Sequence, residues 1–565
     1  MSYLVKTKLE NNKSKTNIYL GTWCFSKPCF ENLDSYNIHN YVWESKSKLY
    51  RHAKIIENKS SDYFKKFCEA LNFIHNENLT QKYWGVLTNK WFTDYLSAFY
   101  VRYLTVKEFI TNNNNPDYKL LDVSEFDTPN GIDFGVNIES DKFNEQLYSQ
   151  ILNNSYVKLL KFNSKNKYAA IPVFSGKCKK ISVGNLYCDP NDIFKICENL
   201  IENVIVDNLS WYNNEYQTNE FNSVRMVFDE ISKQFNSEFE IIFFKSLIIN
   251  TPKLFIEGLP VVRKFLSKNH ELPLLTITNN DHIGNYLSKL AMAESTRMDG
   301  KLIFGQHGPN YGAYNLHLPH MHEFKYSDIY YTWGWSKNNN TKLKNMPSLT
   351  GSSFYIQNYK STNNGVLLFI GSSASKHLWV MDAAPKSTDF INYGRMQKRF
   401  LTSLRKDISE DMIYRPYFDD YDQGLLDNIL STMPDINIIN AGNATELFNH
   451  ARIVVIDRLD SSSLGNLLNR NQPCIIYSDR NNYSFKPEHS GVFEMLNMSG
   501  ILHYTALSAA EYINEIYDNV TQWWYSDQVQ ESRAKYINTF AKPDKNYINI
   551  WTEELNREFK YLNNN

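Results

Sequence analysis

The sequence has 565 residues, and its 60 Lys and Arg residues nearly balance 61 Asp and Glu residues, for a formal net charge of −1. This length predicts two or more domains, and the balanced charge argues against nucleic acid as a partner. Apolar residues make up 42% of the chain and aromatic residues 15%. That share is enough for large buried cores and excludes an intrinsically disordered protein.

The N-terminus, MSYLVKTKLENNKSK, lacks the apolar core of a secretory signal. No window of the sequence approaches the roughly 18 consecutive apolar residues of a membrane span. We therefore expect a cytoplasmic protein whose membrane contact is at most peripheral, at the inner membrane. Seven scattered cysteines form neither a disulfide framework nor a metal-ligand spacing, so we expect reduced thiols, no metal and no cofactor.

The first third of the chain is predicted to be mainly helical. A strand candidate, 17–24, comes first. In 60–77 and 91–110 the apolar residues then recur every three or four positions, which is typical of helices packed on a core.

From residue 238 onwards, strands and helices are predicted to alternate. Strand candidates lie at 239–247, 272–278 and 301–308, and a helix is expected at 282–295. A strand, a crossover helix and a second strand form a βαβ unit, which implies a parallel sheet.

A second alternating set follows the polar segment 336–353, which we interpret as a linker. The predicted fold class is therefore α/β, with two Rossmann-like domains facing a cleft, helical insertions near the N-terminus and a helical tail. We place the domains at 1–335 and 354–540, and expect the C-terminal helix in 541–565 to pack back across them.

The strongest local signal is the stretch IDRLDSSSLGNLLNRNQPCIIY, where a strand is followed by Ser461, Ser462 and Ser463 at a helix start. Serine hydroxyls and free N–H groups at a helix N-terminus bind anions such as phosphate. The same serines are also ordinary helix caps, and the spacing alone leaves both interpretations open.

A second signal is TITNNDHIGNYL, in which a strand ends just before Asn280, Asp281 and His282. Asp281 is either a helix cap or a carboxylate presented at the ligand-binding edge of a parallel sheet. The next strand ends in GQHGPNYG, so His307 is expected at the same edge. A lone histidine is more often structural, but flanking glycines suggest a close approach to a ligand.

Two further loops follow strands of the second set. Gly371 and Ser372 are candidates for holding a phosphate, and Arg415 is a candidate for pairing with one. Both loops are equally consistent with solvated turns.

Three blocks, YLGTWC, GQHGPNYG with SDIYYTWGWS, and IDRLDSSSLGNLLNRNQPCIIY, resemble a family of surface-carbohydrate transferases named after a leptospiral O-antigen cluster protein. The order and spacing of the blocks agree over nearly the whole chain. Pro309 and Asn310 replace small residues of the family block, and Gly465 stands where the family often has a carboxylate. The family is in turn similar to GT-B-like bacterial β-Kdo transferases.

The resemblance implies a retaining glycosyltransferase that moves Kdo or a related ulosonic acid from a CMP-activated donor to a surface glycan or glycolipid. Retention usually requires a covalent intermediate on an enzyme carboxylate. Asp281 is then the candidate nucleophile and His307 the second catalytic residue, with the phosphate at Ser461 to Ser463. The expected donor- or acceptor-binding residues are Asn280, His282, Gln306 and Tyr311.

Two other functions stay open. A CDP-alditol phosphotransferase of polymer synthesis would share the cleft and the cytidine site but would not need Asp281. A non-catalytic carbohydrate-binding subunit is less favoured, because the polar residues collect at strand ends facing one cleft and not on an exposed apolar patch.

Overall fold

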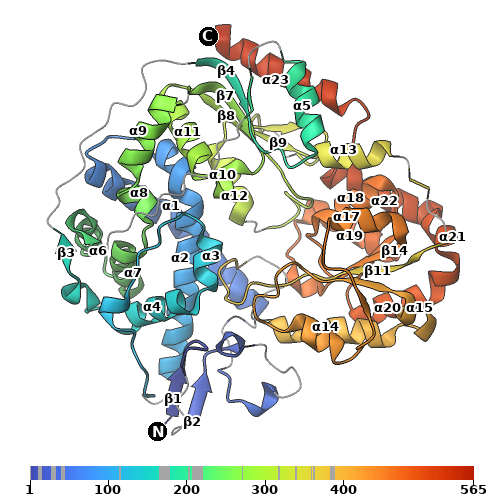
Figure 1. Ribbon diagram of the computed structural model, residues 1–565, viewed down its shortest axis with the longest axis horizontal. Coiled ribbons are helices and arrows are strands. Elements are labelled where there is room, and N and C mark those ends of the chain that lie inside the picture. The colour runs from blue at the N-terminus through green and yellow to red at the C-terminus, as the bar shows by residue number, and fades with distance from the viewer. Residues whose placement is uncertain are drawn as a thin grey trace.

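The computed structural model describes most of the chain. The described residues are 2–10, 16–26, 33–39, 43, 45–113, 116–163, 178–200, 204–206, 221–269, 271–315, 318–336, 340–357, 359–360, 363–381 and 389–564. They contain two six-stranded sheets, each flanked by helices in its own lobe (Figure 1). This arrangement confirms the expected α/β class with two Rossmann-like sheets. Among the described helices, none combines the length and the apolar character needed to cross a membrane.

The N-terminal sheet is entirely parallel, in the order β5, β4, β7, β8, β9, β10. Its strands are β4 (Cys178–Val183), β5 (Val204–Val206), β7 (Pro273–Thr278), β8 (Lys301–Gly305), β9 (Ile329–Thr332) and β10 (Leu343–Asn345). The strand order reverses between β4 and β7. In open α/β sheets, ligands bind beyond the carboxyl ends of the strands at such a switch point.

The C-terminal sheet is also parallel, in the order β13, β12, β11, β14, β15, β16, and its switch point lies between β11 and β14. Its strands are β11 (Val366–Ile370), β12 (Ile413–Arg415), β13 (Asn437–Ile438), β14 (Ala451–Ile456), β15 (Cys474–Tyr477) and β16 (Leu502–His503). The helices between them are α14 (Phe390–Ser403), α15 (Lys406–Asp411), α16 (Leu425–Leu430), α17 (Ala444–Leu447), α18 (Ser462–Arg470), α19 (Pro487–Met498) and α20 (Ala506–Ile516).

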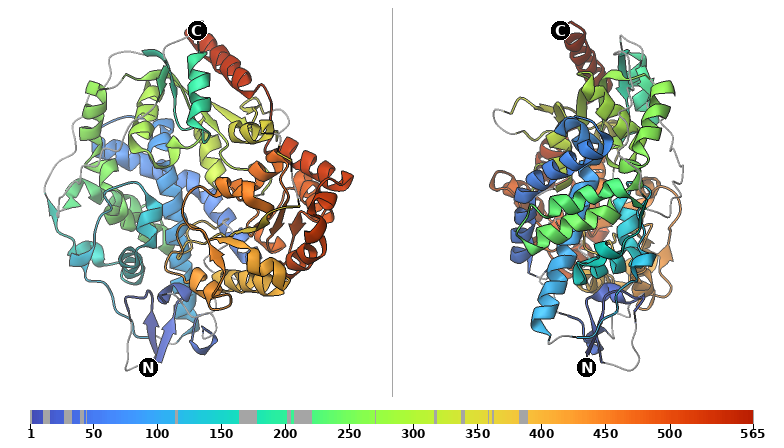
Figure 2. Two further views of the ribbon diagram at one scale, coloured as in Figure 1. Left: turned by 45° about the vertical axis from the view of Figure 1, so that its right-hand side comes forward. Right: turned by 90° about the vertical axis from the view of Figure 1, so that its left-hand side faces the viewer.

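Long helices form a separate layer beside the N-terminal sheet, as the blue and green helices in Figure 2 show. Both helices predicted in the first third are present, and side chains cap their first turns, because Ser45 accepts from the N–H of Lys48 and Thr80 from that of Tyr83. The helices of this part are α1 (Lys46–His75), α2 (Gln81–Asn112), α3 (Phe134–Glu139), α4 (Asp141–Leu152), α6 (Val227–Ser232), α8 (Lys253–Ile256) and α9 (Leu259–Asn269).

Short strands also occur outside the two main sheets. β1 (Ser2–Val5) and β2 (Thr16–Tyr19) pair in parallel, and so do β3 (Phe162–Asn163) and β6 (Phe221–Asn222). The strand expected at 17–24 therefore ends at Tyr19. Among the described residues, five cysteines carry free thiols, namely Cys24, Cys68, Cys188, Cys197 and Cys474. Cys29 lies outside the described residues.

The strand predicted at 239–247 is instead the helix α7 (Glu238–Asn250). Its apolar residues surround the helix, which is buried on most sides, so the sequence has no amphipathic period to distinguish helix from strand. Length decides the matter, because 13 residues exceed an ordinary strand. Glu238 and Glu240 in the first turn also favour a helix through its dipole.

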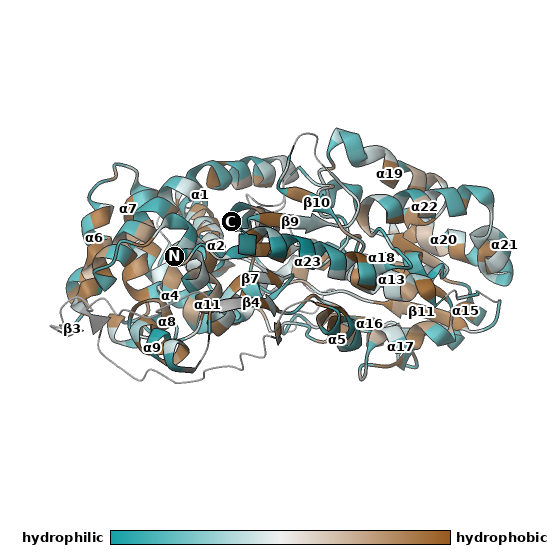
Figure 3. Ribbon diagram, turned by 90° about the horizontal axis from the view of Figure 1, so that it is seen from above, coloured by the Kyte–Doolittle hydropathy of each residue, from teal (hydrophilic) through white to brown (hydrophobic). Residues whose placement is uncertain are grey.

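The segment 336–353, interpreted as a linker, contributes to the fold. Its residues 343–345 form the edge strand β10, and α13 (Leu349–Ile356) begins within it, whereas 337–339 lie outside the described residues. After α21 (Val520–Trp524) and α22 (Asp527–Phe540), the chain returns to the N-terminal lobe. There α23 (Tyr547–Asn564) packs Trp551, Leu555 and Phe559 on the N-terminal sheet beside α5 (Pro190–Glu198) (Figures 1 and 3).

Lys289 is buried within α11 (Tyr286–Arg297), where 1% of it is exposed. Burial, reinforced by the charge of Lys90, lowers its pKa to about 7, whereas an unfolded lysine titrates near pH ~10.4. Between these values the unfolded chain binds more protons, so the stability contributed by this site rises with pH. We expect Lys289→Met to be more stable than wild type at pH 7.

Urea unfolding at successive pH values tests this expectation. The difference in free energy of unfolding between Lys289→Met and wild type should shrink by about 1.4 kcal/mol for each pH unit above about 7. Lys245→Met, the same change at a half-buried position on α7, serves as the matched control. If the difference in free energy of unfolding stays constant with pH, the pKa of Lys289 is not lowered.

Candidate active site

Asp281 lies at the switch point of the N-terminal sheet, where β4 and β7 run side by side. Its Oδ2 accepts hydrogen bonds from the backbone N–H of Asn185 at 2.6 Å and from the hydroxyl of Thr278 at 3.0 Å. A Cβ atom at Gly184 would lie 2.1 Å from the same oxygen, so only glycine allows the loop after β4 to approach this closely. The half-buried carboxylate is therefore held in one orientation.

The side chain of Asp281 does not cap a helix. The short helix α10 (Asp281–Gly284) begins at Asp281 itself, and the cap position belongs to Asn280, whose side chain makes no capping hydrogen bond. The backbone N–H of Asp281 donates to the Thr278 hydroxyl at 3.0 Å. The helix-cap interpretation is therefore wrong. The predicted helix 282–295 is also interrupted, because α11 starts anew after Asn285.

His307 follows β8, the strand paired with β7, so it lies on the same edge of the sheet as Asp281. Its side chain is 20% exposed. Its Nε2 lies 3.0 Å from the hydroxyl of Tyr311, and its ring lies 6.1 Å from the ring of Tyr187. Tyr311 is otherwise buried, so its hydroxyl holds the imidazole in place. A partly exposed imidazole at this edge is suited to proton transfer.

Glu323 is a functional candidate that the sequence analysis missed. It lies on α12 (Leu318–Tyr326), is 1% exposed, and its Oε1 lies 3.6 Å from His307 Nδ1 and 3.5 Å from His282 Nε2. Its Oε2 accepts from the Tyr330 hydroxyl at 2.8 Å. A buried carboxylate behind a histidine is the usual way to fix the ring and to stabilise its protonated form.

Two of the expected ligand-binding residues have structural roles. His282 is fully buried and stacks on Phe304 at 4.5 Å between ring centroids, and burial lowers its pKa to about 3, so the ring is neutral. The Gln306 side chain is also fully buried, and it accepts from the N–H of Trp333 at 3.0 Å and from the indole of Trp335 at 2.8 Å. Neither side chain is exposed, because Gln306 is hydrogen-bonded and His282 is packed against Phe304 in the interior.

The glycine-rich loop after His307 joins the two lobes. The side-chain amide of Asn310 donates to the backbone oxygen of Leu459 at 2.9 Å, and the hydroxyl of Tyr314 donates to Asp460 at 3.1 Å. Asn310 also accepts from the Tyr536 hydroxyl at 2.8 Å. These contacts hold the carboxyl ends of β8 and β14 face to face.

The serine cluster lies at the start of α18, directed at this loop. Ser461 occupies the cap position and accepts from the N–H of Ser463 at 3.3 Å, so one serine caps the helix as the simpler interpretation requires. Ser462 is exposed, and it lines one pocket together with His307 and Tyr187. The N-terminus of α18 and the candidate catalytic histidine therefore border the same space.

The first two N–H groups of the loop after β11, those of Gly371 and Ser372, are hydrogen-bonded within the protein. The N–H of Ser372 donates to Asp457 Oδ1 at 3.0 Å, and Asp457 is buried with a pKa that burial raises. The space beside Gly371 is filled by the Tyr414 hydroxyl, 2.6 Å from where a Cβ atom would lie. The N–H of Gly371 donates to the Arg415 backbone oxygen at 2.9 Å, so both N–H groups are paired within the protein. Ser372 nevertheless lines a cavity of about 350 Å³ beyond β11 and β12, so the phosphate contacts of Gly371 and Ser372 stay predictions.

The Arg415 guanidinium donates to the backbone of the protein itself. Its guanidinium donates to the backbone oxygens of Ile439, Ala441 and Gly442 at 3.0, 2.8 and 2.7 Å. These three hydrogen bonds hold the loop after β13. The predicted phosphate pairing of Arg415 is therefore corrected to a structural role.

Arg458 is a second residue that the sequence analysis missed. It directly follows Asp457 at the end of β14, is partly exposed, and lies 3.6 Å from Asp460. Its charge also acts on Tyr417, which lines a cavity of about 350 Å³ beyond β11 and β12 together with Ser373 and Asn440. Arg458 precedes the first residue of α18 by four positions, and a guanidinium is suited to neutralising a phosphate.

Three solved structures share part of the chain arrangement. The UDP co-structure of S. aureus MnaA has 10% identity and a TM-score of 0.38, over 68% of this chain and 96% of that chain. The wall teichoic acid polymerase TagF with CDPG has 10% identity and a TM-score of 0.32, over 68% and 90%. The Thermobaculum terrenum O-GlcNAc transferase has 8% identity and a TM-score of 0.33, over 94% and 96%. Similarity at this level does not indicate a substrate.

No curated protein sequence matches the chain. In contrast, the sequence profile described as "LIC12162 family transferase" matches residues 2–555 and so spans both sheets and every residue of the candidate site. The expectation of a transferase is thereby confirmed, whereas the similarity to Kdo transferases stays a prediction. The chain belongs to the LIC12162 family of transferases.

Proposed function

We propose that the chain is a glycosyltransferase that takes Kdo or a related ulosonic acid from a CMP-activated donor and transfers it to a surface glycan. The main support is that candidate site residues of both lobes line one pocket. His307, from the N-terminal sheet, and Ser462, at the N-terminus of α18, line the same pocket, and Asp281 lies on the sheet edge of His307. A donor phosphate at α18 would bring its sugar to these side chains.

The chemistry would proceed in two displacements. The Asp281 carboxylate attacks the anomeric carbon, the bond from that carbon to the phosphate oxygen breaks, and CMP leaves with the electron pair. An acceptor hydroxyl then gives its proton to His307 and attacks the same carbon, which releases Asp281 and restores the original configuration. Glu323 stabilises His307 while it carries the proton.

The leaving phosphate would be neutralised by the N-terminus of α18 and by Arg458, with the nucleoside in the cavity lined by Ser373 and Tyr417. The serine cluster and the arginine supply this charge without a metal ion. Transfer should accordingly be unaffected by a chelator, and strict dependence on an added divalent cation would contradict this part of the proposal.

Ser462→Ala combined with Ser463→Ala should weaken CMP binding by about 1 to 3 kcal/mol, because in this proposal both hydroxyls donate to a charged phosphate oxygen. A thermal-shift panel with CMP, UMP, UDP and GDP identifies the nucleotide first, since a ligand of the folded state raises the melting temperature. Calorimetry then measures the affinity of the double variant.

The control variant is Ser490→Ala, which changes a serine in the first turn of α19 outside the site. It should bind CMP as wild type does. Unchanged CMP affinity in a folded Ser462→Ala/Ser463→Ala protein would place the nucleotide elsewhere. Preference for UDP or GDP over CMP would mean that the donor carries that nucleotide, bound at the same site.

The pairing of His307 with Glu323 favours one alternative. A histidine backed by a carboxylate is sufficient to activate an acceptor hydroxyl for attack on phosphorus, so a CDP-alditol phosphotransferase could use the same pocket without Asp281. Incubation with CMP-Kdo and with CDP-glycerol in parallel separates the two. Turnover of CDP-glycerol by an Asp281→Ala variant would establish the alternative.

A further inference from the structure

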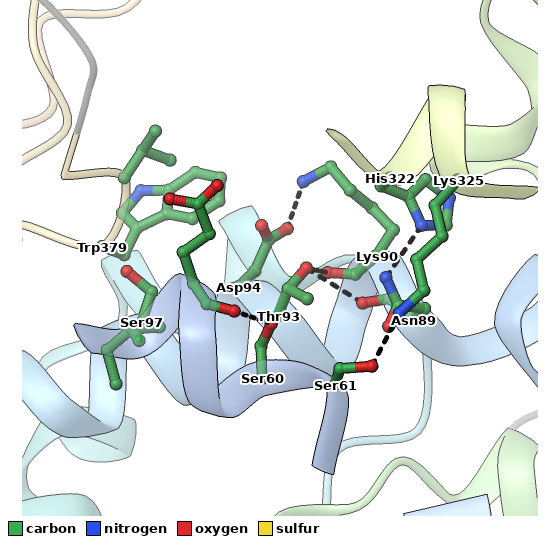
Figure 4. A pocket seen from close by; sticks show the side chains of 13 residues that line it. Ser60, Ser61, Asn89, Lys90, Thr93, Asp94, Ser97, His322, Lys325 and Trp379 are labelled. Atoms are coloured by element: carbon green, nitrogen blue, oxygen red, sulfur yellow. Dashed lines mark hydrogen bonds and ion pairs between the residues drawn. The ribbon is translucent and has the colours of Figure 1, made fainter. Parts of the chain in front are cut away.

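A second pocket lies between helices of the N-terminal lobe and a segment of the C-terminal lobe. α1, α2 and α12 form its walls, and Trp379, from the segment after β11, closes one side (Figure 4). Its volume is about 200 Å³. The residues that line it are separate from those of the candidate active site, so this pocket, which we call the α2 pocket, has no role in the mechanism above.

The polar groups of the α2 pocket are of mixed type and balanced charge. Lys90 forms an ion pair with Asp94 one helical turn away, while Glu57 on α1 and Lys325 on α12 add one charge of each sign. The two lysines are thus offset by two carboxylates, and the lining has no net positive charge that would favour an anionic ligand. Carboxylates, amides and hydroxyls together accept and donate hydrogen bonds, which is what a neutral polyhydroxylated ligand requires.

Two buried polar atoms that line the pocket have no hydrogen-bond partner among the described residues. Ser97 is 2% exposed and its hydroxyl is unpaired. His322 is 3% exposed, its Nδ1 lies 3.1 Å from the Asn89 amide, and its Nε2 is unpaired. Burial holds the pKa of His322 well below its usual range, so the neutral ring has one donor and one acceptor. Unpaired buried groups are costly, and ligand hydroxyls would satisfy them.

Trp379 supplies an aromatic ring beside these polar groups, and the Lys90 ammonium lies 5.7 Å from the ring centroid. Its indole packs edge-on to Phe134 at 5.8 Å and donates to the Ser375 hydroxyl at 3.0 Å. The segment is anchored in the N-terminal lobe, because Arg102 donates to the backbone oxygen of Leu378 at 2.7 Å. The ring is therefore held in place before any ligand arrives, which lowers the entropic cost of binding.

We infer that the α2 pocket binds a neutral saccharide unit. A pyranose presents hydroxyls at its edge and C–H groups on its face, and the pocket offers hydrogen-bonding groups next to an indole. If the proposed function holds, that saccharide belongs to the glycan acceptor. α12 connects the two sites, since His322 lines the pocket and the adjacent Glu323 contacts His307.

Saturation-transfer NMR on the full chain tests the inference with the methyl glycosides of glucose, galactose, mannose and N-acetylglucosamine. At least one should bind wild type, and Trp379→Ala and Thr93→Leu, both of which alter the lining, should each weaken it about tenfold or more. Phe194→Ala, a change at an exposed aromatic residue of α5, is the matched control and should bind as wild type does. Thermal unfolding establishes that each variant is folded.

Absence of binding for all four glycosides, or binding insensitive to both pocket substitutions, would overturn the inference. Binding of inorganic phosphate that is lost in Lys90→Met would also overturn it and make the pocket an anion site. CMP thermal shifts on the same variants separate this test from that of the proposed function. If a saccharide binds but CMP does not raise the melting temperature, the proposed function is contradicted and the inference about the α2 pocket is still supported.

Discussion

Asp281→Ala is expected to reduce sugar transfer by more than about 1,000-fold while CMP binding stays unchanged. The nucleophile is removed, but the nucleotide would be held by α18 and Arg458 in the other lobe. The test is intact-protein mass after mixing with CMP-Kdo and related donors in the absence of an acceptor. Wild type should gain the mass of one sugar, and Asp281→Ala should not.

Asp281→Asn is the sharper variant, because it keeps the shape that Asn185 and Thr278 surround. It should lose nearly as much activity as Asp281→Ala, since an amide is a poor nucleophile. Asp133→Asn, which changes the cap of α3, is the matched control and should transfer normally. Full activity in Asp281→Asn would sink the nucleophile assignment.

Gly184→Ala should also impair transfer, because the new Cβ atom would lie 2.1 Å from Asp281 Oδ2 and would displace the carboxylate. This variant retains every polar side chain of the site, so its loss of activity would report on the position of Asp281 and of its hydrogen-bond partner Thr278, which the Cβ atom also approaches.

His307→Ala is expected to lower the rate of transfer by about 100- to 10,000-fold, the usual contribution of a general base. Formation of the glycosyl-enzyme should survive, because attack by Asp281 needs no base. The same mass measurement would therefore show sugar accumulating on the variant, and transfer to acceptor would be the impaired step.

Glu323→Gln tests whether Glu323 positions His307 or only stabilises the buried core. If Glu323 acts through His307, the double variant His307→Ala/Glu323→Gln should be no slower than His307→Ala alone, since the two residues work as a unit. Glu446→Gln, on the exposed start of α17, is the control. Additive losses in the double variant would reduce Glu323 to a residue of the buried core.

Periodicity in the sequence was sufficient for much of the fold. The three-and-four spacing predicted α1 and α2, and apolar runs ending in glycine or polar residues predicted β7 and β8 in a parallel sheet. These signals are local, because a helix or strand that covers a core must repeat its apolar residues with its own period. The period was uninformative for α7, which is buried on most sides, and there the prediction was wrong.

The sequence by itself determined where chemistry-bearing residues leave the strands, because polar residues and glycines after a buried strand mark its carboxyl end. It placed Asp281 and His307 at one edge and Ser462 at a helix start. Only the tertiary structure decided which of these groups remain available. Asp457 accepts a hydrogen bond from the N–H of Ser372, and the Arg415 guanidinium donates to three backbone oxygens. His282 and Gln306 are buried and therefore inaccessible to a ligand. Glu323 joins His307 across 16 residues of chain, and such pairings depend on packing between elements, which no local pattern encodes.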